Sequence, residues 1–182
     1  MDTEWPRIKS RQTIKISPWV NIIAREVEFA RNEPTQIYHA VDQLDYLAIV
    51  AVTPDGQFPI VRQYRPSLEA FTWELPAGLA ERGEDPADAC LRELLEETGY
   101  PTTAIHHLGT EAACTGRLSN RIHSYFLRTG EQIENFQPEA GMTVKLVTAA
   151  DLVRMIKAGE FVQQMHLGAL LLAQLQSFIE LR

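Results

Sequence analysis

Three glutamates, Glu93, Glu96 and Glu97, lie within five consecutive positions of the chain. Carboxylates held this closely repel one another and raise their own pKa values unless cations lie among them. Clustered oxygen ligands suit Mg²⁺ or Mn²⁺ better than Zn²⁺, which prefers cysteine and histidine. The segment therefore predicts a site for a divalent metal ion. The alternative is a solvated helix face on which glutamate and arginine side chains pair.

A helix must position these carboxylates, and its two ends can be identified in the sequence. Asp85 is a good N-cap, Pro86 suits the first helical position, and Gly99 supplies a left-handed residue after the last turn. We therefore expect a helix over residues 86–98. At about 100° per residue, the glutamates fall on one side and the apolar residues on the other. This pattern predicts an acidic face and a core face, the latter formed by Ala87, Leu91, Leu94 and Leu95.

Seven residues of this segment have a spacing that resembles the signature of the Nudix hydrolases. The seven residues are Gly78, Glu84, Arg92, Glu93, Glu96, Glu97 and Gly99. The resemblance implies that Glu84 and Arg92 form an ion pair that braces the loop beginning at Gly78. It also implies that the three glutamates ligate metal and that the protein cleaves nucleoside diphosphates linked to another moiety. The signature covers 23 of 182 residues, so it assigns the reaction class and not the substrate.

Two stretches just upstream, residues 62–66 and 73–78, resemble the ADP-ribose and nucleoside diphosphate sugar pyrophosphatase branch of that family. By this resemblance the Ala77 carbonyl is a metal ligand, and Arg62 or Arg65 contacts phosphate or the terminal sugar. Guanidinium groups suit this role because they offer forked donors to phosphate oxygens. For each arginine the alternative is a surface charge at the end of a strand.

The N-terminal segment, residues 1–42, carries two tryptophans and is too short to bury a core of its own. In related pyrophosphatases this region forms a small β domain that packs on a second subunit and helps to bind the base. The resemblance therefore implies a homodimer in which Trp5 or Trp19 stacks on the substrate base. Ordinary packing is the alternative for either side chain.

Residues 115–123 depart from the Ser/Asp-Pro-Gly type of stretch expected at this place in the ADP-ribose enzymes. The segment is rich in hydrogen-bond donors, among them Arg117 and Ser119. A polar loop that follows a strand can line a binding site, so we expect these two side chains at the sugar–phosphate site. The departure leaves GDP-mannose or a similar sugar nucleotide open as a substrate beside ADP-ribose.

Catalysis also needs a base that orients or deprotonates water. In the pyrophosphatase branch the base often comes from a mobile acidic loop before the last strand, which corresponds here to residues 131–141. Glu139 has the favoured spacing from the next strand, and Gly141 offers flexibility. Glu93 or Glu96 is the alternative base, and a solvated loop is the alternative interpretation of the segment.

The order of the expected elements predicts an α/β (α+β) fold. Apolar and β-branched runs indicate β structure within 11–29, broken at Ser17-Pro18, and strands at 36–41, 46–53, 59–63, 104–113, 122–127 and 143–148. Residues 54–57 are typical of a hairpin turn. Further helices are expected over about 149–158, capped by Thr148, and 167–180. The family resemblance implies an α/β/α sandwich with a mixed sheet, in which a small β extension (1–42) precedes the Nudix domain (43–182).

Composition narrows the possible partners and compartments. A formal charge of −7 argues against a duplex-binding surface, which needs clustered lysine and arginine. No stretch approaches the ~18 apolar residues of a membrane span, and the first residues lack the apolar segment of a secretory signal. Two cysteines are too few for a disulfide scaffold. We therefore expect a cytoplasmic protein with neither a nucleic-acid nor a membrane partner.

These features together predict a Mg²⁺- or Mn²⁺-dependent pyrophosphohydrolase. It would convert a nucleoside diphosphate sugar to a nucleoside monophosphate and a sugar phosphate. One alternative is a Nudix ligand-binding or regulatory module without catalysis, which the full set of glutamates disfavours. Another is an enzyme that acts on an RNA cap, which the lack of a basic tract disfavours.

Overall fold

The computed structural model describes residues 5–181 of the chain. The chain forms two compact units. The first consists of residues 1–44 and 112–121, and the second of residues 45–111 and 122–182.

The first unit is built on a three-stranded antiparallel sheet in the order β1-β2-β3. Its strands are β1 (Arg7–Lys15), β2 (Asn21–Glu28) and β3 (Gln36–Asp42). The break expected at Ser17 is confirmed, because the Ser17 hydroxyl accepts hydrogen bonds from the backbone N–H groups of Trp19 and Val20 in the turn between β1 and β2. Residues 112–121 join this unit through Val41, whose N–H donates to the Arg117 carbonyl at 2.8 Å.

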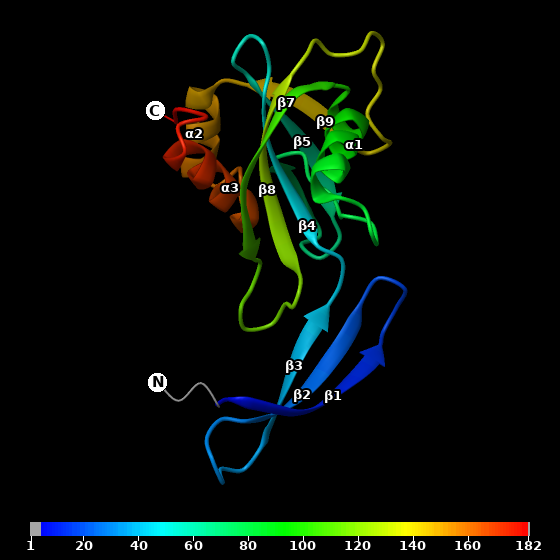
Figure 1. Ribbon diagram of the computed structural model, residues 1–182. Coiled ribbons are helices and arrows are strands. Elements are labelled where there is room, and N and C mark those ends of the chain that lie inside the picture. The colour runs from blue at the N-terminus through cyan, green and yellow to red at the C-terminus, as the bar shows by residue number, and fades with distance from the viewer. Residues whose placement is uncertain (1–4, 182) are drawn as a thin grey trace. The chain divides into compact units, whose positions relative to one another are not determined.

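The second unit contains two three-stranded sheets (Figure 1). One has the order β4-β8-β7, with β4 (Tyr46–Val52) parallel to β8 (Arg121–Thr129), and β7 (Thr102–Ala112) at its edge. The other has the order β6-β5-β9, in which β5 (Phe58–Arg65) pairs antiparallel with both β6 (Ala70–Glu74) and β9 (Thr143–Val147). The mixture of parallel and antiparallel pairs confirms the expected mixed β architecture.

Three helices cover these strands: α1 (Pro86–Thr98), α2 (Ala149–Lys157) and α3 (Gln164–Leu175). Both α1 and α3 contact β4, and Figure 1 shows α1 on one side of β4 and β8, with α2 and α3 on the other. The central core cluster joins β4 to α1 and β8; its largest members are Leu47, Ile49, Leu94, Tyr125 and Leu127. The second unit is therefore an α/β/α sandwich, as the family resemblance implies.

Three expectations about elements need correction. The turn at 54–57 exists, with Gly56 at φ 75°, but β4 and β5 do not form a hairpin because they belong to different sheets. The buried β4 takes β8 as its parallel partner instead. Strand β6 had no counterpart among the expected strands. Helix α3 ends at Leu175, well before residue 180, because Ser177 adopts a left-handed conformation with φ 63°.

Within residues 5–181, the structure contains no helix with the length and apolar character needed to cross a membrane.

Candidate active site

The helix that carries the glutamate cluster begins and ends where the sequence predicts. Asp85 Oδ1 accepts a hydrogen bond from the Ala87 N–H at 2.8 Å, which caps the first turn. Gly99 has φ 71° and donates its N–H to the Leu95 carbonyl at 2.9 Å. These local signals suffice because N-cap and left-handed C-terminal residues satisfy helix-end groups without help from distant residues.

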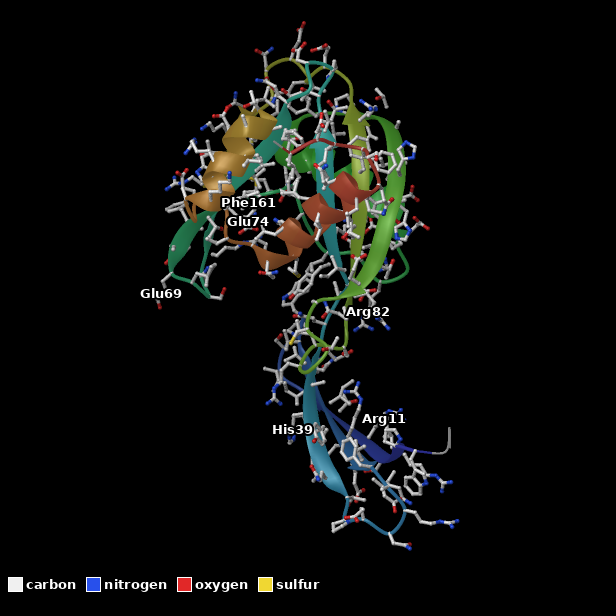
Figure 2. All side chains as sticks on the ribbon, turned by 90° about the vertical axis from the view of Figure 1, so that its left-hand side faces the viewer. Arg11, His39, Glu69, Glu74, Arg82 and Phe161 are labelled. Carbon is white, nitrogen blue, oxygen red and sulfur yellow. The ribbon has the colours of Figure 1, made fainter. Side chains whose placement is uncertain are left out.

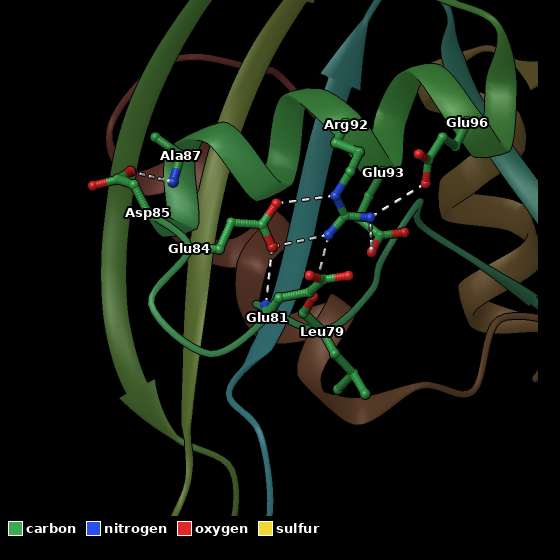
Figure 3. A network of polar contacts seen from close by, with 8 residues as sticks. All are labelled: Leu79, Glu81, Glu84, Asp85, Ala87, Arg92, Glu93 and Glu96. Carbon is green, nitrogen blue, oxygen red and sulfur yellow. Dashed lines mark hydrogen bonds and ion pairs between the residues drawn. The ribbon is translucent and has the colours of Figure 1, made fainter. Parts of the chain in front are cut away.

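Arg92 joins this helix to the loop before it (Figure 3). Its guanidinium makes a forked ion pair with Glu84, with Nε–Oε1 and Nη2–Oε2 distances of 3.0 Å. Glu84 Oε2 also accepts from the Glu81 N–H at 2.9 Å. The Arg92 hydrogen bonds hold the pKa of Glu84 below its ordinary value. The two side chains thus close residues 81–84 onto α1.

The same guanidinium also contacts two of the clustered glutamates. Arg92 Nη1 lies 2.8 Å from Glu93 Oε1 and 3.2 Å from Glu96 Oε2. The Glu96 side chain is 55% exposed, whereas that of Glu93 is only 16% exposed. Arg92 therefore provides positive charge at one edge of the cluster, and Glu96 lies at its solvent side.

The Glu93 carboxyl group lies directly against Gly78. A Cβ atom built on Gly78 would come within 2.1 Å of Glu93 Cδ, closer than real atoms approach. A larger residue at position 78 would therefore force this carboxyl group to move. Burial raises the pKa of Glu93, although its ion pair with Arg92 opposes the shift.

Glu97 is the most buried of the three glutamates, with 8% of its surface exposed. Its Oε2 accepts a hydrogen bond from the Ala77 N–H at 3.0 Å. Burial, reinforced by the nearby charge of Glu93, raises the pKa of Glu97 to about 8. A bound cation would favour the charged form of this carboxyl group.

The expected division of α1 into an acidic and a core face is confirmed only in part. Leu94 belongs to the core cluster and Ala87 packs against it, but the other positions differ. Leu91 and Leu95 are 36% and 40% exposed, whereas Glu97 is buried beside Leu94. Glu97 follows Leu94 by three positions, so both side chains project from the same side of the helix. Periodicity alone assigns Leu91 and Leu95 to the core. In the structure, the hydrogen bond from the Ala77 N–H holds the Glu97 carboxyl group on the buried side instead.

The backbone of residues 76–78 places the Ala77 peptide groups on the glutamate side. The carbonyls of Pro76 and Gly78 accept hydrogen bonds from the Ile49 and Leu47 N–H groups of β4, at 3.1 and 3.0 Å. Successive residues of an extended segment face opposite ways, so the Ala77 carbonyl faces away from β4. The Ala77 N–H lies on that side too, where it donates a hydrogen bond to Glu97.

The donor chemistry of this cluster fits a hard divalent cation. The Ala77 carbonyl and the Glu93 and Glu97 carboxylates offer oxygen atoms, which Mg²⁺ and Mn²⁺ prefer. Across residues 5–181, however, no three His, Cys, Asp or Glu side chains are gathered closely enough to hold a metal ion. Glu96 is exposed and paired with Arg92. The fit therefore rests on two carboxylates and a backbone carbonyl.

The two arginines of β5 have different partners. Arg65 is bound to Glu74, with Nε 2.8 Å from Oε1, and Glu74 also accepts from the Thr72 hydroxyl. Burial alone would raise the pKa of Glu74, but the hydrogen bonds from Arg65 and Thr72 outweigh it and hold the pKa below its ordinary value. Arg62 is exposed, and its guanidinium carbon lies 4.3 Å from the centre of the Phe71 ring. Arg65 is thus fixed in orientation, whereas Arg62 lies over an aromatic surface.

Glu139 is exposed and belongs to an irregular segment between β8 and β9. The first part of this segment is attached to the end of α1, where the Ile133 N–H donates to the Gly99 carbonyl at 2.9 Å. The Phe136 ring covers Gly99 so closely that a Cβ there would lie 2.4 Å from it. The Glu139 carbonyl accepts from the Met142 N–H at 2.9 Å, which forms a turn at Gly141.

The remaining candidate residues, Trp5, Trp19, Arg117 and Ser119, belong to the first unit. Trp19 is 68% exposed, and the Arg7 guanidinium carbon lies 4.6 Å from the centre of the Trp5 ring. Arg117 and Ser119 line a cavity of about 360 Å³, together with Arg25, Tyr38, His39, Ala40, Thr115, Gly116 and Leu118. Ser119 Oγ donates to the Val41 carbonyl at 3.1 Å.

Sequence reasoning missed one polar contact in the segment that precedes Ala77. His166, on α3, is 2% exposed, and its Nδ1 accepts a hydrogen bond from the Leu75 N–H at 3.1 Å. The single histidine in the otherwise largely apolar sequence of α3 is the only local signal of such a role.

Comparison with known proteins identifies the family. A family model described as "NUDIX domain" matches residues 44–165. The chain is 31% identical over 117 residues to an ADP-ribose pyrophosphatase of Bacillus subtilis, covering 63% of each protein. It is 32% identical over 135 residues to an ADP-ribose pyrophosphatase of Mycobacterium tuberculosis, covering 72% of this chain and 65% of that one. A methanol dehydrogenase activator of Bacillus methanolicus is 39% identical over 89 residues, 49% of this chain and 48% of that protein.

The chain thus spans between about half and two thirds of the length of these curated relatives. A crystal structure of an ADP compounds hydrolase superposes with a TM-score of 0.77, covering 97% of this chain and 96% of that one at 18% identity. This similarity confirms the fold.

Proposed function

Because this chain belongs to the NUDIX domain family, we propose that it hydrolyses the diphosphate linkage of nucleoside diphosphate sugars. ADP-ribose is the first candidate substrate, and GDP-mannose or a similar sugar nucleotide is the second. Water adds across the P–O–P bridge, so the products are a nucleoside monophosphate and a sugar phosphate. The similarity to two proteins named ADP-ribose pyrophosphatase supports this substrate class.

One observation carries the proposal. Residues 77–78 and α1, which are separated in the chain, place the Glu93 carboxyl against Gly78 and the Glu97 carboxyl on the Ala77 N–H. Both carboxyl groups have raised pKa values because burial disfavours their charge. A structural role alone does not need one buried and one partly buried acid beside an available backbone carbonyl. A charged ligand that takes their negative charge explains the arrangement.

We propose that this ligand is Mg²⁺ or Mn²⁺, held by the Ala77 carbonyl, Glu93 and Glu97, with Glu96 as a further ligand from the solvent side. When bound, such an ion offsets the charge of the diphosphate and lowers the pKa of a bound water molecule. Gly78 keeps space for Glu93, and the Glu84–Arg92 pair fixes the loop against the helix.

The arginines of β5 are proposed to contact the phosphates or the terminal sugar. Glu74 holds Arg65 by two hydrogen bonds, so less conformational freedom is lost when this guanidinium binds an anion. Arg62 is exposed and has room to turn toward a ligand. Glu139 is proposed to orient or deprotonate the attacking water, with Glu93 or Glu96 as the alternative base.

We further propose that the protein is a homodimer in which residues 1–42 pack across the interface. In the described part of the first unit, Val27 is the one buried hydrophobic residue, while Ile16, Trp19 and Ile37 are each more than 60% exposed. A partner subunit would cover such side chains. Trp5 or Trp19 would then stack on the substrate base, and the cavity lined by Arg117 and Ser119 would contact the sugar or phosphate.

A regulatory role is the second candidate, because one relative is named a methanol dehydrogenase activator. Such a module would bind a nucleotide without turning it over. The glutamate pair and its brace count against this alternative, since a binding module has no need of every catalytic carboxylate.

The deciding experiment is a substrate panel with product analysis by chromatography, carried out with Mg²⁺, with Mn²⁺ and with excess EDTA. The panel contains ADP-ribose, GDP-mannose, other nucleoside diphosphate sugars and a capped RNA. We expect a nucleoside monophosphate and a sugar phosphate from a sugar nucleotide, only when metal is present. Binding without turnover of every sugar nucleotide would favour the regulatory alternative, and cleavage of the capped RNA alone would assign a different substrate class.

A further inference from the structure

Helix α3 lies outside the signature segment, yet it contacts the strand-like segment that carries Ala77. His166, in the first turns of α3, reaches Leu75 across 91 positions of the chain. The distance between His166 Nδ1 and the Leu75 nitrogen is 3.1 Å, and the histidine is 2% exposed. The Phe161 ring lies beside the imidazole, with 6.3 Å between ring centres. Figure 2 labels Phe161 and Glu74 in this part of the second unit.

The direction of this hydrogen bond defines the state of the imidazole. A backbone N–H can only donate, so Nδ1 must be an unprotonated acceptor and the ring proton must lie on Nε2. Protonation of Nδ1, or replacement of the ring by an apolar side chain, would leave the Leu75 N–H buried without its acceptor. A lost partner for a buried backbone donor is costly, so the backbone would move to find another.

Leu75 lies within residues 74–77, and each of these four residues forms a hydrogen bond with a different helix or strand. Glu74 is held by Arg65 of β5, and the Pro76 carbonyl is held by Ile49 of β4. The Ala77 N–H is held by Glu97 of α1. The hydrogen bond from Leu75 to His166 provides the contact from the remaining side, that of α3. In an extended chain a rotation of one peptide group changes the direction of the next ones, because only two soft dihedral angles separate them.

We propose that His166 is a positioning residue for the active site. By accepting the Leu75 N–H, it fixes the backbone that directs the Ala77 carbonyl toward Glu97. This inference rests on the proposed function, because it assigns a role to the Ala77 carbonyl in that same site. His166 itself touches neither the substrate nor the reacting atoms.

Two substitutions separate the acceptor role from simple packing. His166→Leu replaces the imidazole with an apolar side chain of moderate size and so removes the hydrogen-bond acceptor. His166→Asn keeps a short side chain whose amide oxygen can accept from Leu75. Phe161→Leu is the matched control, because it reduces packing beside the imidazole and leaves the hydrogen bond in place.

We expect His166→Leu to lower kcat by about 10- to 100-fold, the scale that misplacement of an active-site group by about 1 Å causes. KM should change by less than about three-fold, because the diphosphate and sugar contacts are elsewhere. His166→Asn should recover most of the lost kcat, and Phe161→Leu should lower the thermal midpoint without a comparable loss of kcat. Wild-type kcat in folded His166→Leu would overturn the proposal, as would an equal loss in the leucine and asparagine variants.

A second measurement does not require turnover. Amide hydrogen exchange of Leu75 and a Mg²⁺ titration followed by thermal unfolding are carried out on the same proteins. His166→Leu should expose the Leu75 amide and weaken the Mg²⁺ response, while His166→Asn should preserve both. If the leucine variant does not fold, fast exchange of the Leu75 amide in the wild-type protein still overturns the proposal. If the wild-type protein cleaves no sugar nucleotide, the proposed function fails, whereas the exchange result still tests the hydrogen bond.

Discussion

The Glu97 carboxylate accepts a hydrogen bond from the Ala77 backbone N–H, with 3.0 Å between Oε2 and the nitrogen. This contact connects α1 to the segment that carries the Ala77 carbonyl. Glu97 is buried at this contact, and its burial raises the pKa of the carboxyl group to about 8. Burial disfavours the charged form of this carboxyl group, and a bound cation would favour it again. Strongly shifted pKa values of this kind cluster at functional sites.

We predict that removal of either the Glu93 or the Glu97 carboxylate abolishes most activity. Glu93→Gln and Glu97→Gln should each lower kcat by about 10²-fold or more, the scale associated with loss of acid–base or electrostatic stabilisation. Chelation should have the same effect on the wild-type protein. Glu160→Gln is the matched control, because Glu160 forms an exposed pair with Arg154 in α2. Full turnover in excess EDTA would contradict the metal proposal.

Gly78→Ala should impair the site without unfolding the domain. The added methyl group would displace the Glu93 carboxyl, which lies where the Cβ must go. We expect kcat to fall by at least about 10-fold through misplacement of this group. Gly168→Ala is the control, because a Cβ there meets open space within α3. Its activity should stay unchanged, and its stability should rise by roughly 0.5–1 kcal/mol. Equal kinetics for both alanine variants would show that Glu93 need not lie against residue 78.

The proposed base can be tested separately from the metal ligands. Glu139→Gln should depress kcat strongly and leave KM and Mg²⁺ affinity nearly unchanged, because water activation matters mainly in the transition state. Glu131→Gln and Glu134→Gln are controls from the same loop, and we expect near-wild-type rates from both. Near-wild-type turnover by Glu139→Gln would move the role to Glu93, Glu96 or another glutamate of the loop.

Acid should destabilise the protein partly through His166. Burial lowers the pKa of His166 to about 4 from an ordinary value of 6.5. The unfolded chain therefore binds a proton at higher pH than the folded protein does. The contribution of His166 to stability is complete above pH 6.5 and is lost as the pH falls toward 4, by an amount on the order of 3 kcal/mol.

Denaturant unfolding of the wild-type protein and His166→Asn between pH 7.5 and 4 measures this effect. The difference between their free energies of unfolding should shift in favour of the variant as the pH falls. A difference independent of pH would show that the imidazole titrates normally in the folded protein.

The role of the N-terminal unit is tested by Trp19→Ala. If Trp19 stacks on the substrate base, KM should rise more than kcat falls, because a remote stacking contact binds ground and transition states alike. Sedimentation should show a dimer at micromolar concentration. A monomer, together with unchanged KM in both Trp5→Ala and Trp19→Ala, would leave these side chains as ordinary packing residues.

The sequence by itself determined the features that depend on neighbouring residues. Asp85 and Gly99 defined the ends of α1 because capping groups act within one turn. Thr148 did the same for α2, where its hydroxyl accepts from the Asp151 N–H. The spacing of the glutamates and their brace was enough to indicate the family, which the match over residues 44–165 shows.

Only the tertiary structure decided which of these side chains are buried and what they contact. Periodicity placed Leu91 and Leu95 in the core, yet both are exposed while Glu97 is buried. The turn at 54–57 suggested a hairpin, but the partner of β4 is β8, far along the chain. The contact of His166 with Leu75 spans 91 positions, and the histidine within α3 does not by itself identify Leu75 as its partner. Such pairings depend on how sheets and helices fill the core together, and a local pattern carries no information about a distant partner.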